Sequence, residues 1–200
     1  MTRAAVDLTT FFKAEFAEHN EVARHTEAAL SKAFAKLVQA CATSIRGGGK
    51  LMFFGNGGSA ADAQHLATEL TVRYKKDRAA IAAIALTTDS SALTAVGNDL
   101  GFEKIFARQI EALGRNGDVA VAISTSGKSA NVIAGLQQAK AMGLVTAAFG
   151  ANDGGSMPTH ADHLLLVPSV TTARIQEMHI LLGQMLCGAL EIELGLAAAR

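Results

Sequence analysis

Five short runs of apolar residues alternate with longer segments of helical periodicity, and this alternation constrains the fold more than any other feature of the chain. Strands that are buried on both faces are nearly continuous apolar runs, whereas half-exposed strands alternate polar and apolar residues. The order therefore predicts an α/β fold with a parallel sheet that helices cover on both faces. The expected strands are 50–55, 79–86, 118–125, 145–151 and 163–169.

The helical segments between these runs have recognisable starts and stops. Ser59 is expected to be the N-cap of its helix, and the glycines at 47–49 end the first one. The third segment should be interrupted near Gly97 and Gly101. The expected helices are 7–46, 59–74, 90–114, 129–142 and 172–195.

Composition places the chain among soluble globular proteins of the cytoplasm. Its 200 residues suit one domain, 1–200, with an N-terminal helical segment over 1–46. Half the residues are hydrophobic and the formal net charge is zero, so neither nucleic acid nor a membrane surface is expected as a partner. The N-terminus lacks the apolar core of a signal peptide, and no apolar run approaches the roughly 20 residues of a membrane span. Cys41 and Cys187 lie in apolar helical contexts and are expected to be reduced core residues.

The glycine turn "GNGGS" (55–59) follows the first strand directly and opens a helix. Ligands of parallel sheets bind at this edge, and the free N–H groups of a helix start suit a phosphate, here with Asn56, Gly57 and Ser59. Two alternatives remain open. The glycines can simply permit a tight turn. Gly55, Gly57 and Ala60 also fit the dinucleotide pattern G-x-G-x-x-A, with Asp89 as the ribose-binding acid at an unusually long spacing.

A second loop, "ISTSGKS" (123–129), stands at the end of the third strand. Its hydroxyl groups and the N–H groups of the next helix would cradle one phosphate monoester. A P-loop is excluded because its first glycine would fall at Ala122. The alternative is a serine-rich capped turn without a ligand. The hydroxyls in question belong to Ser124, Thr125, Ser126 and Ser129. Two such loops at one sheet edge favour a sugar phosphate over a dinucleotide.

His65 and Glu69 are four residues apart, so both side chains lie on one face of a helix. Imidazole nitrogen and carboxylate oxygen at this spacing suit zinc. From the residues alone, a surface His–Glu pair without a metal is the better interpretation.

Three motifs together resemble the sugar-isomerase (SIS) family, namely "GNGGSAADAQH" from residue 55, "ISTSGKSANV" from 123 and "ARIQEMH" from 173. The resemblance extends from roughly residue 35 to the C-terminus. It implies a five-stranded parallel sheet in a flavodoxin-like three-layer sandwich, and a homotetramer with active sites between subunits. It also implies a zinc ion beside the bound sugar.

The resemblance carries site roles onto particular positions. His65, Glu69 and Gln176 fall on zinc ligands, and Arg73 and Asp99 on residues that reach the sugar. The family's fourth ligand, a histidine that also acts as an acid or base, is Gln184 here. An amide oxygen ligates zinc weakly and carries no proton near neutral pH. His179 is on the same helix, but we interpret it as a structural residue.

The implied activity is an aldose–ketose shift on a heptose phosphate. Sedoheptulose 7-phosphate would become glycero-manno-heptose 7-phosphate, a lipopolysaccharide precursor, through an ene-diolate, with Glu69 as the base and Gln184 at the second catalytic position. The alternative is a non-catalytic SIS module that binds a sugar phosphate or a protein partner, like the DnaA initiator-associating protein. Glu69 favours the isomerase because a pure binding module needs no carboxylate opposite a histidine, while Gln184 argues against it.

Overall fold

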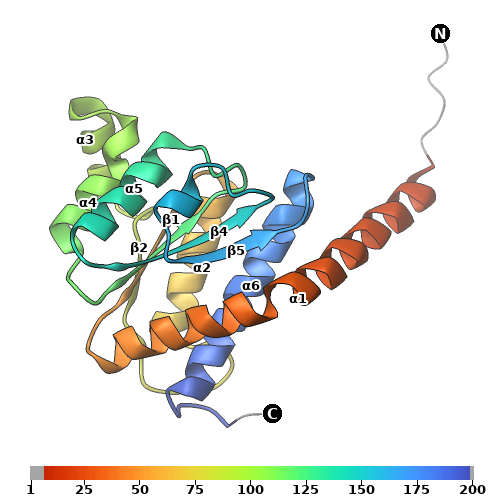
Figure 1. Cartoon of the computed structure of the whole chain (residues 1–200), viewed down its shortest axis with the longest axis horizontal. Coiled ribbons are helices and arrows are strands. Elements are labelled where there is room, and N and C mark those ends of the chain that lie inside the picture. Colours follow the sequence, from red (N-terminus) through yellow and green to blue (C-terminus); the bar gives the residue numbers. More distant parts are fainter. Residues whose placement is uncertain (1–6, 199–200) are drawn as a thin grey trace.

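The computed structural model describes residues 7–198, and the first six and last two residues of the predicted 1–200 domain lie outside the described part. Five strands form one parallel sheet in the order β2-β1-β3-β4-β5 (Figure 1). Gly55 at the end of β1 is paired in register with Ile123 at the end of β3. The strands are β1 Leu51–Gly55, β2 Ala83–Ala85, β3 Val119–Ile123, β4 Val145–Ala151 and β5 His163–Val167.

Helices cover both faces of this sheet, so the predicted α/β three-layer architecture is confirmed. Successive strand residues point to opposite faces: Phe53 packs with α1, α2 and α6, whereas Phe54 packs with α4 and α5. Both rings are fully buried. The helices are α1 Leu8–Arg46, α2 Gly58–Thr71, α3 Ser90–Asp99, α4 Ile105–Leu113, α5 Ala130–Ala141 and α6 Thr172–Glu193.

Three predicted boundaries on the β1–α2–β2 unit were wrong, and one of them is the end of α2, which is Thr71 and not residue 74. Helix α2 has Gly57 as its N-cap, with φ of +57°, so Ser59 is a buried residue inside the first turn and not the cap. The predicted strand 79–86 shortens to β2 because Ile81 N–H donates to Leu70 O at the end of α2 instead of to the sheet.

The expected break in the third helical segment is present at one of its two predicted places. Gly101, with φ of +97°, separates α3 from the short 3-10 turn η1 (Phe102–Lys104) that leads into α4. Gly97 lies within α3 and does not interrupt it.

Cys41 and Cys187 are buried and unpaired, as predicted, and burial raises the pKa of both thiols to about 12. None of the helices in the described part of the chain combines the length and apolarity that a bilayer crossing requires.

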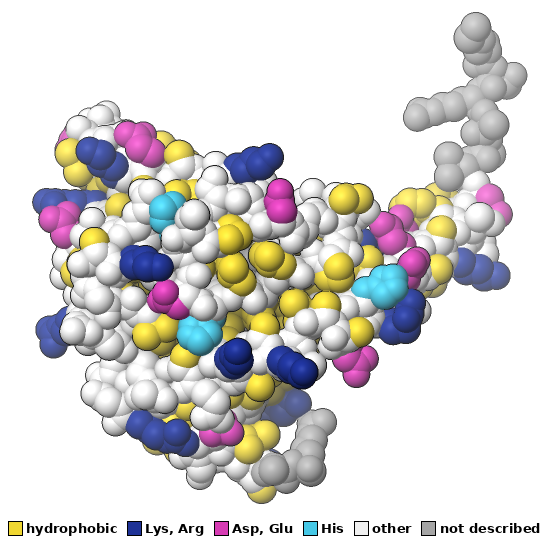
Figure 2. Space-filling model, viewed as in Figure 1, with side chains coloured by type: hydrophobic (Ala, Val, Ile, Leu, Met, Phe, Trp, Pro, Cys, Tyr) yellow, Lys and Arg dark blue, Asp and Glu magenta, His cyan; other side chains and the backbone are white. Residues whose placement is uncertain are grey.

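Helix α1 extends well beyond the body of the molecule at its N-terminal end (Figure 1). Its C-terminal half supplies core residues, but Phe11, Phe12 and Phe16 on the projecting part are more than half exposed. Hydrophobic side chains are visible along this arm (Figure 2). A helix that leaves large apolar side chains in water has a face to which something can bind.

Candidate active site

The loop after β1 leads into the first turn of α2, which lies against the side chain of Gln176. Gly57 and Gly58 are exposed. A Cβ on Gly58 would lie only 2.6 Å from Gln176 Nε2, so the amide of α6 rests on the start of α2. Ser59, predicted to bind phosphate with its hydroxyl, is 4% exposed and lies beneath the turn. The free N–H groups of the turn are therefore more accessible to a ligand than the Ser59 side chain.

The loop after β3 is tightly folded around its own hydroxyl groups. Ser124 Oγ accepts a hydrogen bond from Gly127 N–H at 3.1 Å, and Ser126 Oγ accepts one from Lys128 N–H at 3.3 Å. Ser129 is the N-cap of α5, but its side chain makes no capping hydrogen bond. The Ser129 hydroxyl, the half-buried Thr125 and the start of α5 thus remain available to a ligand.

A third loop, after β4, supports this cradle and was not predicted. Gly127, with φ of +61°, lies so close to Gly154 that a Cβ would be 2.0 Å from the Gly154 oxygen. Ser156 N–H donates to Gly127 O at 2.9 Å. The packing of these loops fixes the shape of the 124–129 segment.

Asn56 and Asn131 join the two ligand loops through a reciprocal pair of amide hydrogen bonds, each 2.8 Å long. Asn131 is 3% exposed and lies in the first turn of α5. Asn56 was predicted to bind the substrate directly. The structure gives it a further role, because its amide holds the loops after β1 and β3 together. Asn131 belongs to the motif that begins at residue 123, but no role was predicted for it.

His65, Glu69 and Gln184 converge from two helices. His65 Nε2 lies 3.2 Å from Glu69 Oε1 on α2, and the Gln184 amide of α6 contacts the same imidazole nitrogen. The His65 side chain is 49% exposed and that of Glu69 is 21% exposed, so a ligand can reach both. The carboxyl of Asp62 is a further neighbour that the sequence analysis missed. Burial raises its pKa and the His65 charge opposes that rise.

The remaining predicted residues lie outside this cluster. His179 is fully buried, and its Nε2 lies 2.9 Å from Gly150 O of β4, as a structural histidine would. Arg73 is exposed beyond the end of α2 and pairs with Asp77 at 2.8 Å. Asp99, at the end of α3, accepts a hydrogen bond from its neighbour Asn98. Neither Arg73 nor Asp99 has a recorded contact with His65 or Glu69 within the described part of this chain.

Asp89, which would bind the ribose in the dinucleotide alternative, has a structural role. Asp89 is the N-cap of α3 and accepts a hydrogen bond from Ala92 N–H at 2.9 Å. A carboxylate that caps a helix is not free to bind both ribose hydroxyls.

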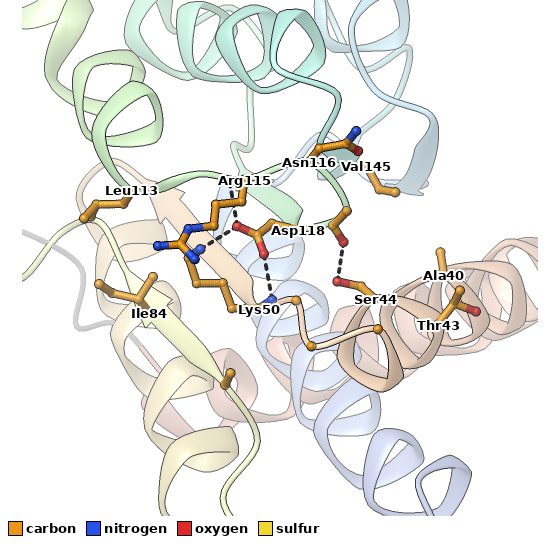
Figure 3. A pocket seen from close by; sticks show the side chains of 15 residues that line it. Ala40, Thr43, Ser44, Lys50, Ile84, Leu113, Arg115, Asn116, Asp118 and Val145 are labelled. Carbon is orange, nitrogen blue, oxygen red and sulfur yellow. Dashed lines mark hydrogen bonds and ion pairs between the residues drawn. The ribbon is translucent and has the colours of Figure 1, made fainter.

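A cavity of about 740 Å³ lies at the opposite edge of the sheet, where the strands begin (Figure 3). Asp118 there accepts hydrogen bonds from Lys50 Nζ at 2.5 Å, from Lys50 N–H and from Arg115 N–H. Ser44 donates to Gly117 O. Because these polar groups are engaged with one another, and because ligands of parallel sheets bind at the carboxyl ends of strands, this cavity is not the candidate site.

A model of the SIS domain family matches residues 16–151. The chain belongs to the SIS domain family, as the three sequence motifs had indicated.

Within this family, the chain is similar to phosphoheptose isomerases from several bacteria. The phosphoheptose isomerase of Paramagnetospirillum magneticum is 59% identical over 182 residues, which cover 91% of this chain and 95% of that protein. That of Campylobacter jejuni is 51% identical over 173 residues, covering 86% and 92%. The structure of the phosphoheptose isomerase from Neisseria gonorrhoeae superposes with a TM-score of 0.87 at 43% identity, covering 92% of this chain and 98% of that one. These comparisons support the isomerase hypothesis and not the alternative of a non-catalytic module.

Proposed function

We propose that this chain is a phosphoheptose isomerase that converts sedoheptulose 7-phosphate into glycero-manno-heptose 7-phosphate. The observation that carries the proposal is the convergence of His65 and Glu69 from α2 with Gln184 from α6, on helices that border the two ligand loops. In this proposal the reaction takes place in the cytoplasm and its product enters lipopolysaccharide precursor synthesis.

Glu69 is the base of the proposed reaction. The conversion moves a proton from C1 of the ketose to C2 through an ene-diolate, and the hydroxyl proton of O1 moves to O2. One carboxylate can carry the proton from C1 to C2 because the two carbons are adjacent. The Glu69 side chain is only 21% exposed, which limits exchange of the proton with water. Gln184 cannot transfer a proton, but its amide N–H can donate a hydrogen bond to an oxygen that becomes negative.

The phosphate anchor is the loop after β3. The hydroxyls of Thr125 and Ser129 and the N–H groups at the start of α5 would hold the phosphate, with the α2 turn at Gly57 on its other side. Ser124 and Ser126 shape the loop through hydrogen bonds to its backbone. A firm anchor matters because the reacting carbons are at the far end of a seven-carbon chain.

Zinc fits the chemistry of the donor set. Among residues 7–198 no three His, Cys, Asp or Glu side chains gather where one metal could bind, so a metal here depends on amide oxygens as well. His65 and Glu69 would supply one imidazole and one carboxylate, and Gln176 and Gln184 would supply amides. The amide nitrogen of Gln184 contacts the imidazole nitrogen that would bind the ion, so the amide would have to turn its oxygen toward the metal. Zinc, when bound, would polarise the substrate oxygens as a Lewis acid.

The test is an isomerase assay of the purified chain with sedoheptulose 7-phosphate, with and without added zinc. Turnover of this substrate is expected, and absence of turnover under both conditions would refute the proposed function. Thermal protection by the sugar phosphate tests the anchor separately. We expect protection to be lost in the double variant Ser124→Ala, Ser126→Ala. Protection by NAD in place of the sugar phosphate would favour the dinucleotide alternative.

We further propose a homotetramer whose neighbouring subunits complete the site. An apolar groove between α1 and α6 includes Leu30, Phe34 and the exposed Leu181 and Met185. Together with the exposed phenylalanines of the α1 arm, this surface suits a second copy of the chain. Arg73 and Asp99 would then act on a neighbour's substrate. Light scattering should give four times the chain mass, and a stable monomer at micromolar concentration would contradict this assembly.

A further inference from the structure

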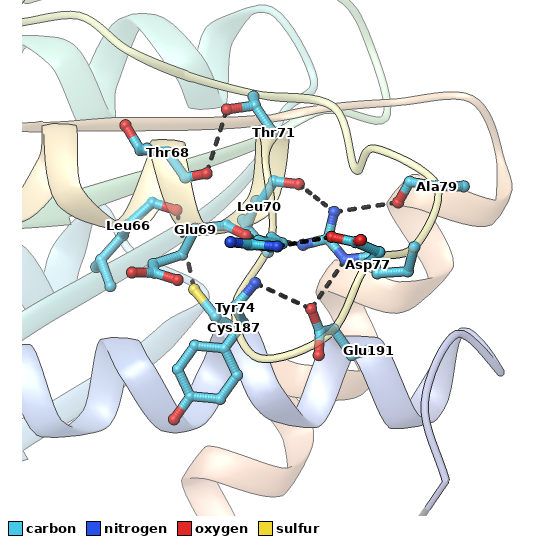
Figure 4. A network of polar contacts seen from close by, with 12 residues as sticks. Leu66, Thr68, Glu69, Leu70, Thr71, Tyr74, Asp77, Ala79, Cys187 and Glu191 are labelled. Carbon is cyan, nitrogen blue, oxygen red and sulfur yellow. Dashed lines mark hydrogen bonds and ion pairs between the residues drawn. The ribbon is translucent and has the colours of Figure 1, made fainter.

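Arg78 and Glu191 form a buried ion pair beside the C-terminal end of α2, the helix that carries His65 and Glu69. The Arg78 Nε donates to Glu191 Oε1 at 2.9 Å, and the two side chains are 2% and 3% exposed. Arg78 lies in the segment that joins α2 to β2, whereas Glu191 lies near the end of α6. The pair therefore links α6 to the segment that follows α2. Glu191 lies on α6 near Tyr74 of this segment (Figure 4).

The guanidinium of Arg78 also holds the C-terminal end of α2. Its Nη2 donates to Glu69 O at 2.7 Å, and its Nη1 donates to Leu70 O at 2.7 Å and to Ala79 O at 3.0 Å. The last carbonyls of a helix lack partners within the helix, and a cation near them is favourable. One of these carbonyls belongs to Glu69 itself, so the backbone of the proposed base is attached to Arg78.

Glu191 binds more than the guanidinium. Its Oε1 also accepts a hydrogen bond from Tyr74 N–H at 3.2 Å. The Tyr74 ring packs so closely on Gly188 that a Cβ there would lie 2.8 Å from the ring. The segment after α2 is thus attached to α6 at Tyr74 and at Arg78, by an ion pair, a backbone hydrogen bond and an aromatic contact.

Helices α2 and α6 run in the same direction and touch at successive levels. Gln176 covers Gly58 at the first level, Gln184 contacts His65 at the second, and Cys187 Sγ lies 3.8 Å from Leu66 O just beyond it. Gly183 makes this approach possible, because a Cβ at that position would be 2.5 Å from the Leu66 side chain. Arg78 and Glu191 form the last level, where polar contacts fix the ends.

We propose that Arg78 and Glu191 are positioning residues for the isomerase, which set the axial register of α2 against α6. This inference rests on the proposed function, because the register matters through the distance between Glu69 on one helix and Gln184 on the other. Apolar contacts between helices tolerate small sliding movements, whereas a fork of directed hydrogen bonds does not. A buried ion pair is also weak as a stabilising device, since an apolar pair of similar volume is often as stable. Its specific bonds to the carbonyl of Glu69 indicate a role in alignment.

The experiment compares Arg78→Lys and Glu191→Gln with the wild-type enzyme under saturating and limiting sedoheptulose 7-phosphate. Lysine keeps the positive charge but cannot bond Glu69 O, Leu70 O and Glu191 at once. We expect kcat to fall about tenfold or more, because supporting residues of this kind typically contribute 10- to 100-fold. KM should stay within about twofold, since the phosphate loop after β3 is held by other contacts.

The matched control is Asp118→Asn, which disrupts the buried ion pair with Lys50 at the opposite edge of the sheet. It should lower the melting temperature as the other variants do, yet leave kcat within about twofold. Wild-type kcat in folded Arg78→Lys and Glu191→Gln, or losses that match those of Asp118→Asn at equal melting temperature, would overturn the proposal. Failure of both variants to fold would overturn it as well, because the pair would then serve stability. If the wild-type chain itself shows no turnover, the proposed function is refuted and the inference with it.

Discussion

Replacing Gly127 with alanine should separate the two loops that close the phosphate cradle. The new Cβ would lie 2.0 Å from the Gly154 oxygen, whereas an ordinary carbon–oxygen contact is about 3.3 Å, so the loops must part by about 1.3 Å. The φ of +61° adds about 1 kcal/mol of conformational cost. Loss of the hydrogen bond from Ser156 N–H to Gly127 O adds about 1 kcal/mol. We expect a destabilisation of about 2–3 kcal/mol, or roughly 4–12 °C in melting temperature for a chain of this size.

Binding should suffer more than stability in this variant. A displacement of about 1 Å at a positioned group can cost up to 100-fold in function, so the affinity for a sugar 7-phosphate should fall about tenfold or more. Differential scanning fluorimetry and isothermal titration calorimetry measure the two effects. The control is Gly48→Ala, which has φ of +81° but nothing within 4 Å of the new Cβ, and which lies far from the cradle in the turn before β1. Equal losses in the two variants would refute the argument that loop contact shapes the cradle.

Three further outcomes follow from the site and its surroundings. Glu69→Gln should abolish turnover yet bind the sugar phosphate with wild-type affinity in calorimetry, and residual turnover above about 1% would exclude Glu69 as the base. Gln184→His should tighten zinc binding in a chelator competition and raise kcat, and unchanged affinity would place residue 184 outside the metal site. Burial lowers the pKa of His179 below its ordinary 6.5, although the hydrogen bond to Gly150 O opposes this shift. The unfolded chain therefore binds a proton that the native chain does not, so stability should fall as the pH drops below about 6.5. Urea unfolding at pH 5.5 and 7.5 should show this dependence weakened in His179→Gln.

Much of the fold could be predicted because strands that are buried on both faces are continuous apolar runs in the sequence. The apolar run over 50–55 was expected to be a strand buried on both faces, and all five residues of β1 are buried. The edge strand β2 was predicted too long. Among residues 79–82 of that predicted strand only Ile81 is buried, and its N–H donates to Leu70 O rather than to the sheet. Apolar composition therefore does not specify the hydrogen-bond partner of each backbone group.

The candidate site, too, could be predicted from the sequence only in part. His65 and Glu69 could be paired from their spacing because one helix holds both. Gln176 and Gln184 could be joined to them only through family resemblance, since no periodicity connects α6 to α2. The amide pair of Asn56 with Asn131 arises from the adjacency of two strands, and the sequence carries no sign of it.

The contact between His65 and Gln184 spans 119 positions of the chain. Residues so far apart meet late in folding, after the intervening strands have ordered and the final helix has docked. The reason is that the entropy of closing a long loop must be lost before the contact across it can form. During synthesis the first helices and strands leave the ribosome well before Gln184 does. A nascent chain therefore acquires a sheet and a phosphate loop before it acquires a reaction centre, and recovery of catalysis during refolding would report the last event of folding rather than the first.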